Sequence, residues 1–108
     1  MHFVFEVHVK AGYTSEQYAD AWVRASELIQ QAPGARGTRL HRRIGDPAVL
    51  LAIATWESKQ ARDAMEADSG ARAERIREII AEQARFVEVR VIGEFEDAEW
   101  VVEPGGNP

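Results

Sequence analysis

The sequence contains no cysteine, which excludes disulfide bonds, thiolate nucleophiles and cysteine metal sites. It has three histidines, His2, His8 and His41, and a single asparagine, Asn107. Its longest apolar run, residues 48–56, spans nine positions, whereas a helix that crosses a bilayer needs roughly 20. No phosphate-binding loop, nucleotide fingerprint or Ser-His-Asp pattern is present. The chain must therefore be stabilised by packing, and association with a second copy would add to that stability.

The formal net charge of −5 disfavours non-specific binding to nucleic acid or to an anionic membrane. The first ten residues, "MHFVFEVHVK", lack the basic region, apolar helix and cleavage site of a secretory signal. We therefore expect a cytoplasmic protein. The 108 residues favour one domain, which we place at residues 1–96. Residues 97–108 are expected to be a C-terminal tail, with the last five residues disordered.

Hydrophobic periodicity predicts six elements. Alternation of apolar residues near the start predicts a strand over residues 2–10. Thr14 and Gln17 form a plausible capping box for a helix that ends before "PGARG". Strands at 37–44 and up to Trp56 flank the turn "GDP", and the second of them reads as central in a sheet because it is almost continuously apolar. A second helix begins after Ser58 and bends at residues 69–70, and a last strand covers residues 86–95.

The resulting order, β-α-β-β-α-β, predicts an α+β ferredoxin-like fold with an antiparallel sheet of strand order 4-1-3-2 and both helices on one face. The other face then carries Glu6 and His8, with Arg39 and His41 or their neighbours, and with Val4 among these charges. A half-apolar open face favours a partner, and we expect a second copy of the chain.

Three stretches together resemble the antibiotic biosynthesis monooxygenase (ABM) domain family: "VHVKAG", "APGARGTRLHRRIGDP" and "ATWESKQARDAMEADSG". The resemblance covers roughly residues 3–95, and its most specific part is the "PG" and "G..LHR...DP" hairpin followed by a strand that closes in "WES". It implies a dimeric α+β barrel in which two sheets face one another. Family members include cofactor-independent monooxygenases that oxidise polycyclic phenols to quinones, heme-degrading oxygenases, and proteins without established activity.

Trp56 closes the third predicted strand, where the resemblance implies an aromatic residue that in some oxygenases lines a cavity. The alternative is that Trp56 only packs under the second helix. Tyr18 and Trp22 lie one turn apart on the first helix. Aromatic residues at this spacing usually pack in the core, but these two could also form the opposite wall of such a cavity. Met65 stands where many family members have a histidine, so that catalytic group is missing.

The heme-degrading pattern is not met, because the chain has no histidine after His41 and no asparagine near the first strand. Glu6 and His8 lie on the same strand face, about 6.6 Å apart along the chain, and are weak candidates for a general base. The alternative is a hydrogen-bonded pair in a dimer interface. No pair of histidines has chelating spacing, so we expect neither a metal nor another cofactor.

The stretch "RGTRLHRR" forms a basic segment on the second strand. Alternation sends its charges to both faces of the sheet and no aromatic residue is interleaved, so an edge strand protected by charge explains it better than a nucleic-acid site. Three functions stay open. The first is a homodimeric oxygenase acting on a small phenolic, aromatic or quinone-type compound without a cofactor, and the alternative is a non-catalytic dimer that binds a small hydrophobic ligand. A heme-binding member is the third possibility.

Overall fold

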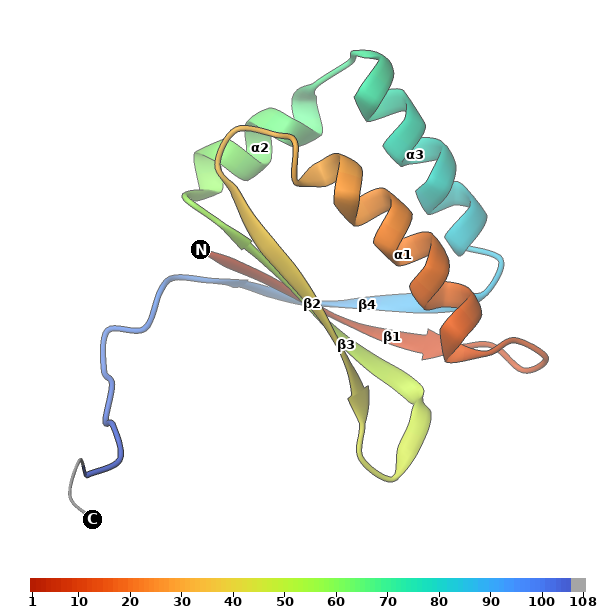
Figure 1. Ribbon diagram of the computed structural model, residues 1–108, viewed down its shortest axis with the longest axis horizontal. Coiled ribbons are helices and arrows are strands. Elements are labelled where there is room, and N and C mark those ends of the chain that lie inside the picture. The colour runs from red at the N-terminus through yellow and green to blue at the C-terminus, as the bar shows by residue number, and fades with distance from the viewer. Residues whose placement is uncertain (106–108) are drawn as a thin grey trace.

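The computed structural model describes residues 1–105 (Figure 1). Seven elements follow the chain in the order β1-α1-β2-β3-α2-α3-β4. Their bounds are β1 His2–Val9, α1 Ser15–Ile29, β2 Ala35–Arg43, β3 Asp46–Trp56, α2 Lys59–Ala67, α3 Ala71–Gln83 and β4 Val87–Phe95. Figure 1 shows the helices on one side of a twisted sheet and the tail leaving the end of β4, away from the helices.

The four strands form one antiparallel sheet of order β2-β3-β1-β4, which confirms the predicted topology. The central strand β1 sets the register: Val7 lies opposite Leu50 of β3 on one side and opposite Val89 of β4 on the other. Val7 is fully buried under the helices together with Tyr18 of α1. The predicted ferredoxin-like α+β fold is therefore confirmed. Alternate residues of β1 point into the core that the helices cover.

Helix α1 begins at the predicted capping box. The Gln17 backbone N–H donates to Thr14 Oγ1 at 3.2 Å, and the Thr14 N–H donates to Gln17 Oε1 at 2.8 Å. Each bond satisfies a donor that the first helical turn leaves unpaired. The buried stripe of Tyr18, Ala21 and Ala25 then faces the sheet and α3.

The predicted second helix is two helices. Ser58 caps α2, as expected, by accepting a hydrogen bond from the Ala61 N–H at 3.1 Å. Asp68 then leaves the helical conformation, with ψ 139°, and its Oδ1 accepts from the Gly70 N–H at 3.1 Å. This local hydrogen bond competes with the helical ladder, so the chain breaks where a bend was predicted.

The sheet face away from the helices carries both charged and apolar side chains. Glu6 and His8 alternate with the buried residues of β1 and point to this open face. Arg39 lies one residue from the helix-side Leu40 on β2 and shares the open face. The predicted mixed open face is therefore present.

Gly34 holds the loop before β2 against α2. Its φ is +84°, and a Cβ at this position would lie 2.6 Å from Ala61 Cβ. Its carbonyl accepts a hydrogen bond from the Glu57 N–H at 2.8 Å, directly before the Ser58 cap. Gly34 thus allows α2 to approach the end of the sheet where Trp56 lies.

Replacing Gly34 with alanine should destabilise the protein by about 2–4 kcal/mol, since left-handed strain adds to the clash with Ala61. The matched control is Gly12→Ala, because Gly12 has φ +90° and open space around it. That variant should lose only about 1–2 kcal/mol. Urea unfolding measures both, and equal losses would show that close packing of Gly34 against α2 contributes nothing.

After Phe95 the described chain forms neither helix nor strand. The expectation of disorder concerned the last five residues, of which 106–108 lie outside the described part. No helix within residues 1–105 has the length and apolar character needed to span a membrane.

Candidate functional site

A cavity of about 440 Å³ lies between the three helices and the sheet. All four residues proposed from the sequence as pocket residues line it: Tyr18, Trp22, Trp56 and Met65. They come from α1, from the end of β3 and from α2, so the fold brings together side chains that are far apart in the chain. That these residues bind a substrate stays a prediction.

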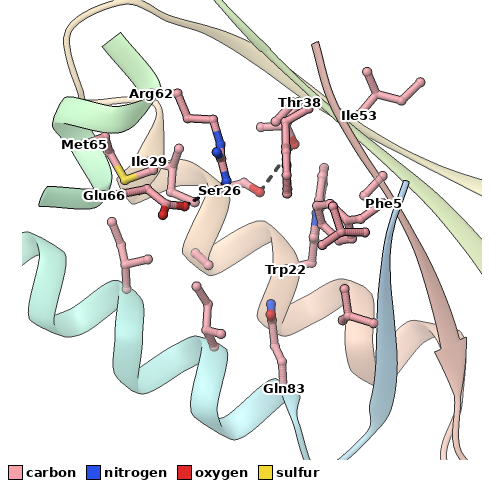
Figure 2. A pocket seen from close by; sticks show the side chains of 18 of the residues that line it. Phe5, Trp22, Ser26, Ile29, Thr38, Ile53, Arg62, Met65, Glu66 and Gln83 are labelled. Atoms are coloured by element: carbon pink, nitrogen blue, oxygen red, sulfur yellow. Dashed lines mark hydrogen bonds and ion pairs between the residues drawn. The ribbon is translucent and has the colours of Figure 1, made fainter. Parts of the chain in front are cut away.

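Aromatic side chains form much of the cavity wall. Trp56 is only 2% exposed and packs among Ala32, Ala61 and Met65. On the floor, the rings of Phe3 and Phe5 lie with their centroids 5.6 Å apart on the helix-covered side of β1. Figure 2 shows Phe5 and Trp22 close together on the sheet side of the cavity. Such walls suit a flat apolar ligand.

The cavity reaches solvent beside α3 and β4. Ile80 of α3 and Val89 and Val91 of β4 line it, and about half of each side chain is exposed. These three apolar side chains therefore form an apolar part of the rim where the cavity opens to solvent.

A guanidinium and a carboxylate reach the cavity from α2. Arg62 Nη2 donates to Glu66 Oε1 at 2.9 Å, and Arg62 Nη1 lies 3.7 Å from Glu94 Oε1 of β4. Arg62 Cζ also lies 3.9 Å from the centroid of the Phe3 ring, in a cation–π contact. Only 14% of the Arg62 side chain is exposed. Figure 2 shows Arg62 extending from α2 toward Ser26 and Thr38.

The other polar residues of the lining are the cationic Arg77 of α3 and three neutral side chains, Ser26, Thr38 and Gln83. Ser26 Oγ and Thr38 Oγ1 lie 3.5 Å apart across the cavity wall, and Gln83 is buried at its α3 side. Among the described residues that line the cavity, Glu66 is the one carboxylate, and none is a histidine. Glu66 is therefore the one residue of the described lining that offers carboxylate oxygens as proton or hydrogen-bond acceptors.

Burial raises the pKa of the Tyr18 hydroxyl from 10 to about 12. The side chain is 1% exposed, and loss of hydration disfavours the phenolate. Tyr18 thus contributes a neutral phenol to the cavity at every physiological pH.

Because the unfolded chain releases the Tyr18 proton near pH 10 and the folded chain near pH 12, this residue should weaken folding as the pH rises between those values. The loss reaches at most about 2–3 kcal/mol. Urea unfolding at pH 9 and pH 11 should therefore show a smaller alkaline loss for Tyr18→Phe than for the unchanged protein. Tyr13→Phe, which removes an exposed hydroxyl, is the control and should behave as the unchanged protein does. Identical alkaline losses in Tyr18→Phe would contradict the assignment.

The weak general-base candidates lie elsewhere. His8 Nε2 and Glu6 Oε1 are hydrogen-bonded, as the sequence suggested. Both are on the open sheet face, whereas their neighbours Phe5 and Val7 face the helices. A hydrogen-bonded pair on that face fits the interface alternative and is not positioned to act on a ligand in the cavity of its own chain.

Arg62 and Glu66 were not identified from the sequence. They were overlooked because charges at helical spacing on an amphipathic helix normally form a solvated face. A signal was present: Arg62 lies three residues before Met65, so both occupy one side of α2. A position of Met65 facing the cavity therefore implies that Arg62 faces the cavity as well.

No metal-binding arrangement occurs within residues 1–105, where no group of three histidine, aspartate or glutamate side chains is close enough to hold an ion. His2 contacts Thr55 and Asp97 at the end of the sheet, and His41 is on the edge strand β2. A heme bound in the cavity would thus find no histidine ligand among the lining residues.

A ferredoxin-like antiparallel sheet with an aromatic cavity under its helices defines a class of small α+β proteins. Comparison with family models then identifies the group within this class. The model described as antibiotic biosynthesis monooxygenase (ABM) matches residues 1–73, and the chain belongs to this family. The resemblance stated from the sequence is thereby confirmed.

Solved structures show the same fold at low identity. SnoaB, a cofactor-independent oxygenase from Streptomyces nogalater, superposes in a mutant form with a TM-score of 0.76 and 15% identity, over 90% of this chain and 92% of that chain. A conserved protein of unknown function from Bacteroides thetaiotaomicron, described as a possible oxidoreductase, gives a TM-score of 0.67 at 13% identity, over 83% of this chain and 89% of that chain. A comparison with curated proteins finds no match. At these identities, the similar structures support the fold alone.

Proposed function

We propose that this protein is a cofactor-independent monooxygenase that oxidises a flat phenolic or anthrone-type compound. The observation that carries the proposal is the aromatic cavity with Glu66 as its one carboxylate. Membership of the ABM family and the fold shared with SnoaB agree with it. The alternative is a non-catalytic protein that binds a small hydrophobic ligand in the same cavity.

In this proposal the substrate ring lies between the aromatic walls. Trp56, Trp22 and Phe5 contact its faces, and Met65 fills the remaining space with a flexible thioether. A cavity of about 440 Å³ is within the size range of small-molecule sites.

Glu66 takes the phenolic proton, and Arg62 stabilises the phenolate that results. The guanidinium already binds Glu66 at 2.9 Å, so the proton moves into a hydrogen-bonded pair. Deprotonation makes the ring electron-rich enough to reduce O₂ itself. One oxygen atom then becomes the new carbonyl of the product, and the other leaves as water, which takes up the hydrogen of the oxidised carbon and the phenolic proton held by Glu66. The substrate supplies all the electrons, so no external reductant is needed.

The experiment that tests the function is incubation with naphthol or an anthrone, with and without oxygen. Oxygen-dependent quinone absorbance is the expected result. Binding without conversion would favour the non-catalytic alternative. Addition of hemin tests the third possibility, because a heme-binding member would shift the Soret band.

The open sheet face supports a homodimer in which two such faces meet. Val4 and Leu51 lie on this face among the charges of Glu6, His8 and Arg39. Light scattering at micromolar concentration should give about twice the chain mass of 12.1 kDa. A single species at the chain mass would rule out the barrel.

A further inference from the structure

Two hydroxyl side chains interrupt an apolar part of the cavity wall. Ser26 belongs to the side of α1 that otherwise presents apolar lining residues, among them Trp22 and Ile29. Thr38 of β2 lies opposite Ala54 of β3, which also lines the cavity. Both hydroxyl side chains are half-buried. We refer to Ser26 and Thr38 as the hydroxyl pair.

The two hydroxyls contact one another only loosely. Ser26 Oγ and Thr38 Oγ1 lie 3.5 Å apart, whereas an O–H···O hydrogen bond normally spans about 2.5–3.0 Å. Within residues 1–105 neither oxygen has another hydrogen-bond partner. Each hydroxyl can donate one hydrogen bond and also accept. Most of this capacity is therefore available to a group inside the cavity.

The spacing of the hydroxyl pair suits one ligand oxygen. An atom that lies about 2.8 Å from each of the two hydroxyl oxygens, an ordinary hydrogen-bond distance, fits over positions that are 3.5 Å apart. A hydroxyl donates to a carbonyl oxygen and accepts from a phenol, so the pair can bind either kind of oxygen. The pair therefore has both the free capacity and the geometry of a small polar subsite.

The hydroxyl pair lies on the side of the cavity to which the charged residues of α2 extend. Figure 2 shows Arg62 pointing toward Ser26 and Thr38, and Arg62 is bound to Glu66 at 2.9 Å. In the proposed function, Arg62 and Glu66 bind the phenolic oxygen that loses its proton. A second ligand oxygen on the hydroxyl pair is then a near neighbour of the first, on the same side of the aromatic rings.

We infer that Ser26 and Thr38 form a subsite for a second oxygen substituent, so that the cavity selects flat aromatic ligands with two neighbouring oxygens over ligands with one. A site that hydrogen-bonds a ligand hydroxyl discriminates against the analogue that lacks it. This inference rests on the proposed function only in taking the cavity as the ligand site. It applies equally to the non-catalytic alternative.

Calorimetric titration without oxygen tests the ligand side, because binding is then measured and no oxidation takes place. The ligands are 1-naphthol, 1,8-dihydroxynaphthalene, whose second hydroxyl neighbours the first, and 1,5-dihydroxynaphthalene, whose second hydroxyl lies on the opposite side of the rings. The 1,8 isomer should bind about five- to tenfold more tightly than 1-naphthol, which is the gain from one hydrogen bond. The 1,5 isomer should bind like 1-naphthol.

Thr38→Val and Ser26→Ala test the protein side. Valine keeps the branched shape of threonine and alanine favours a helix, so the midpoint of urea unfolding should stay close to that of the unchanged protein. In the double variant the affinity for the 1,8 isomer should fall to that for 1-naphthol, whose own affinity should not change. The control is Thr55→Val, because the Thr55 hydroxyl contacts His2 at 3.1 Å and does not belong to the described lining. This control should keep the full preference.

Equal affinity for the 1,8 and 1,5 isomers would overturn the subsite, as would a preference for the 1,8 isomer that persists in the double variant. An equal loss of affinity for 1-naphthol and the 1,8 isomer would do the same, since it would show that the hydroxyl pair only maintains the shape of the cavity. If oxygen-dependent quinone still forms in any of these cases, the proposed function stands without the subsite. A preference that the double variant loses, in a protein that forms no quinone, supports the subsite within the non-catalytic alternative.

Discussion

Trp56→Ala is expected to destabilise the protein by about 3–5 kcal/mol, a large share of the total stability of a small domain. Trp56 is 2% exposed and packs between the end of β3 and the residues of α2. Truncation to a methyl group therefore leaves a hole that the surrounding elements fill only in part. Urea unfolding measures the loss, and a value under about 1 kcal/mol would contradict the observed packing.

Trp56→Phe separates the binding role from the structural one. It keeps an aromatic wall, so the protein should stay folded, but the smaller ring should weaken naphthol binding by up to about tenfold. Phe86→Leu is the control, because Phe86 packs at the other end of the core and does not line the cavity. Unchanged affinity in a stable Trp56→Phe protein would mean that Trp56 only fills the core.

Glu66→Gln should lower the rate of substrate oxidation by about 100-fold or more, which is the range of a lost general base. The amide keeps the size of the side chain and its oxygen still accepts from Arg62, so the cavity should bind substrate as before. Oxygen uptake with an anthrone measures the effect. The matched control is Glu78→Gln on the exposed side of α3, where Glu78 pairs with Arg75 at 3.2 Å. If both variants oxidise the substrate at the original rate, Glu66 is not the base.

The fold was predictable because each element carries a strong local pattern. Alternation along β1 and the apolar run of β3 indicated the sheet, and the capping box of Thr14 and Gln17 placed the start of α1. Strand order followed from the short hairpin and the handedness of the two crossovers. The sequence predicted a bend at the boundary of α2 and α3 but not a complete break. The break depends on the hydrogen bond that the Asp68 side chain accepts from Gly70.

The site was only half predictable. Large aromatic residues at helical or strand spacing are expected on buried faces, so Tyr18, Trp22 and Trp56 were found among the cavity lining. Arg62 and Glu66 were not, because the burial of Arg62 depends on its contact with Phe3, which no local pattern encodes, and Glu66 reaches the cavity through its ion pair with Arg62. The Glu6–His8 pair was correct as a contact, but strand alternation places it on the face opposite the cavity.

Oxidation of an anthrone under isotopically labelled oxygen gas tests directly whether the protein is a cofactor-independent oxygenase, with protein treated to remove metals and without added flavin or heme. A cofactor-independent oxygenase should give a quinone that carries one labelled oxygen atom, with the second label in water, and Glu66→Gln should form much less of this labelled quinone. A quinone without label, or formation of product only after a metal, flavin or heme is added, would contradict it.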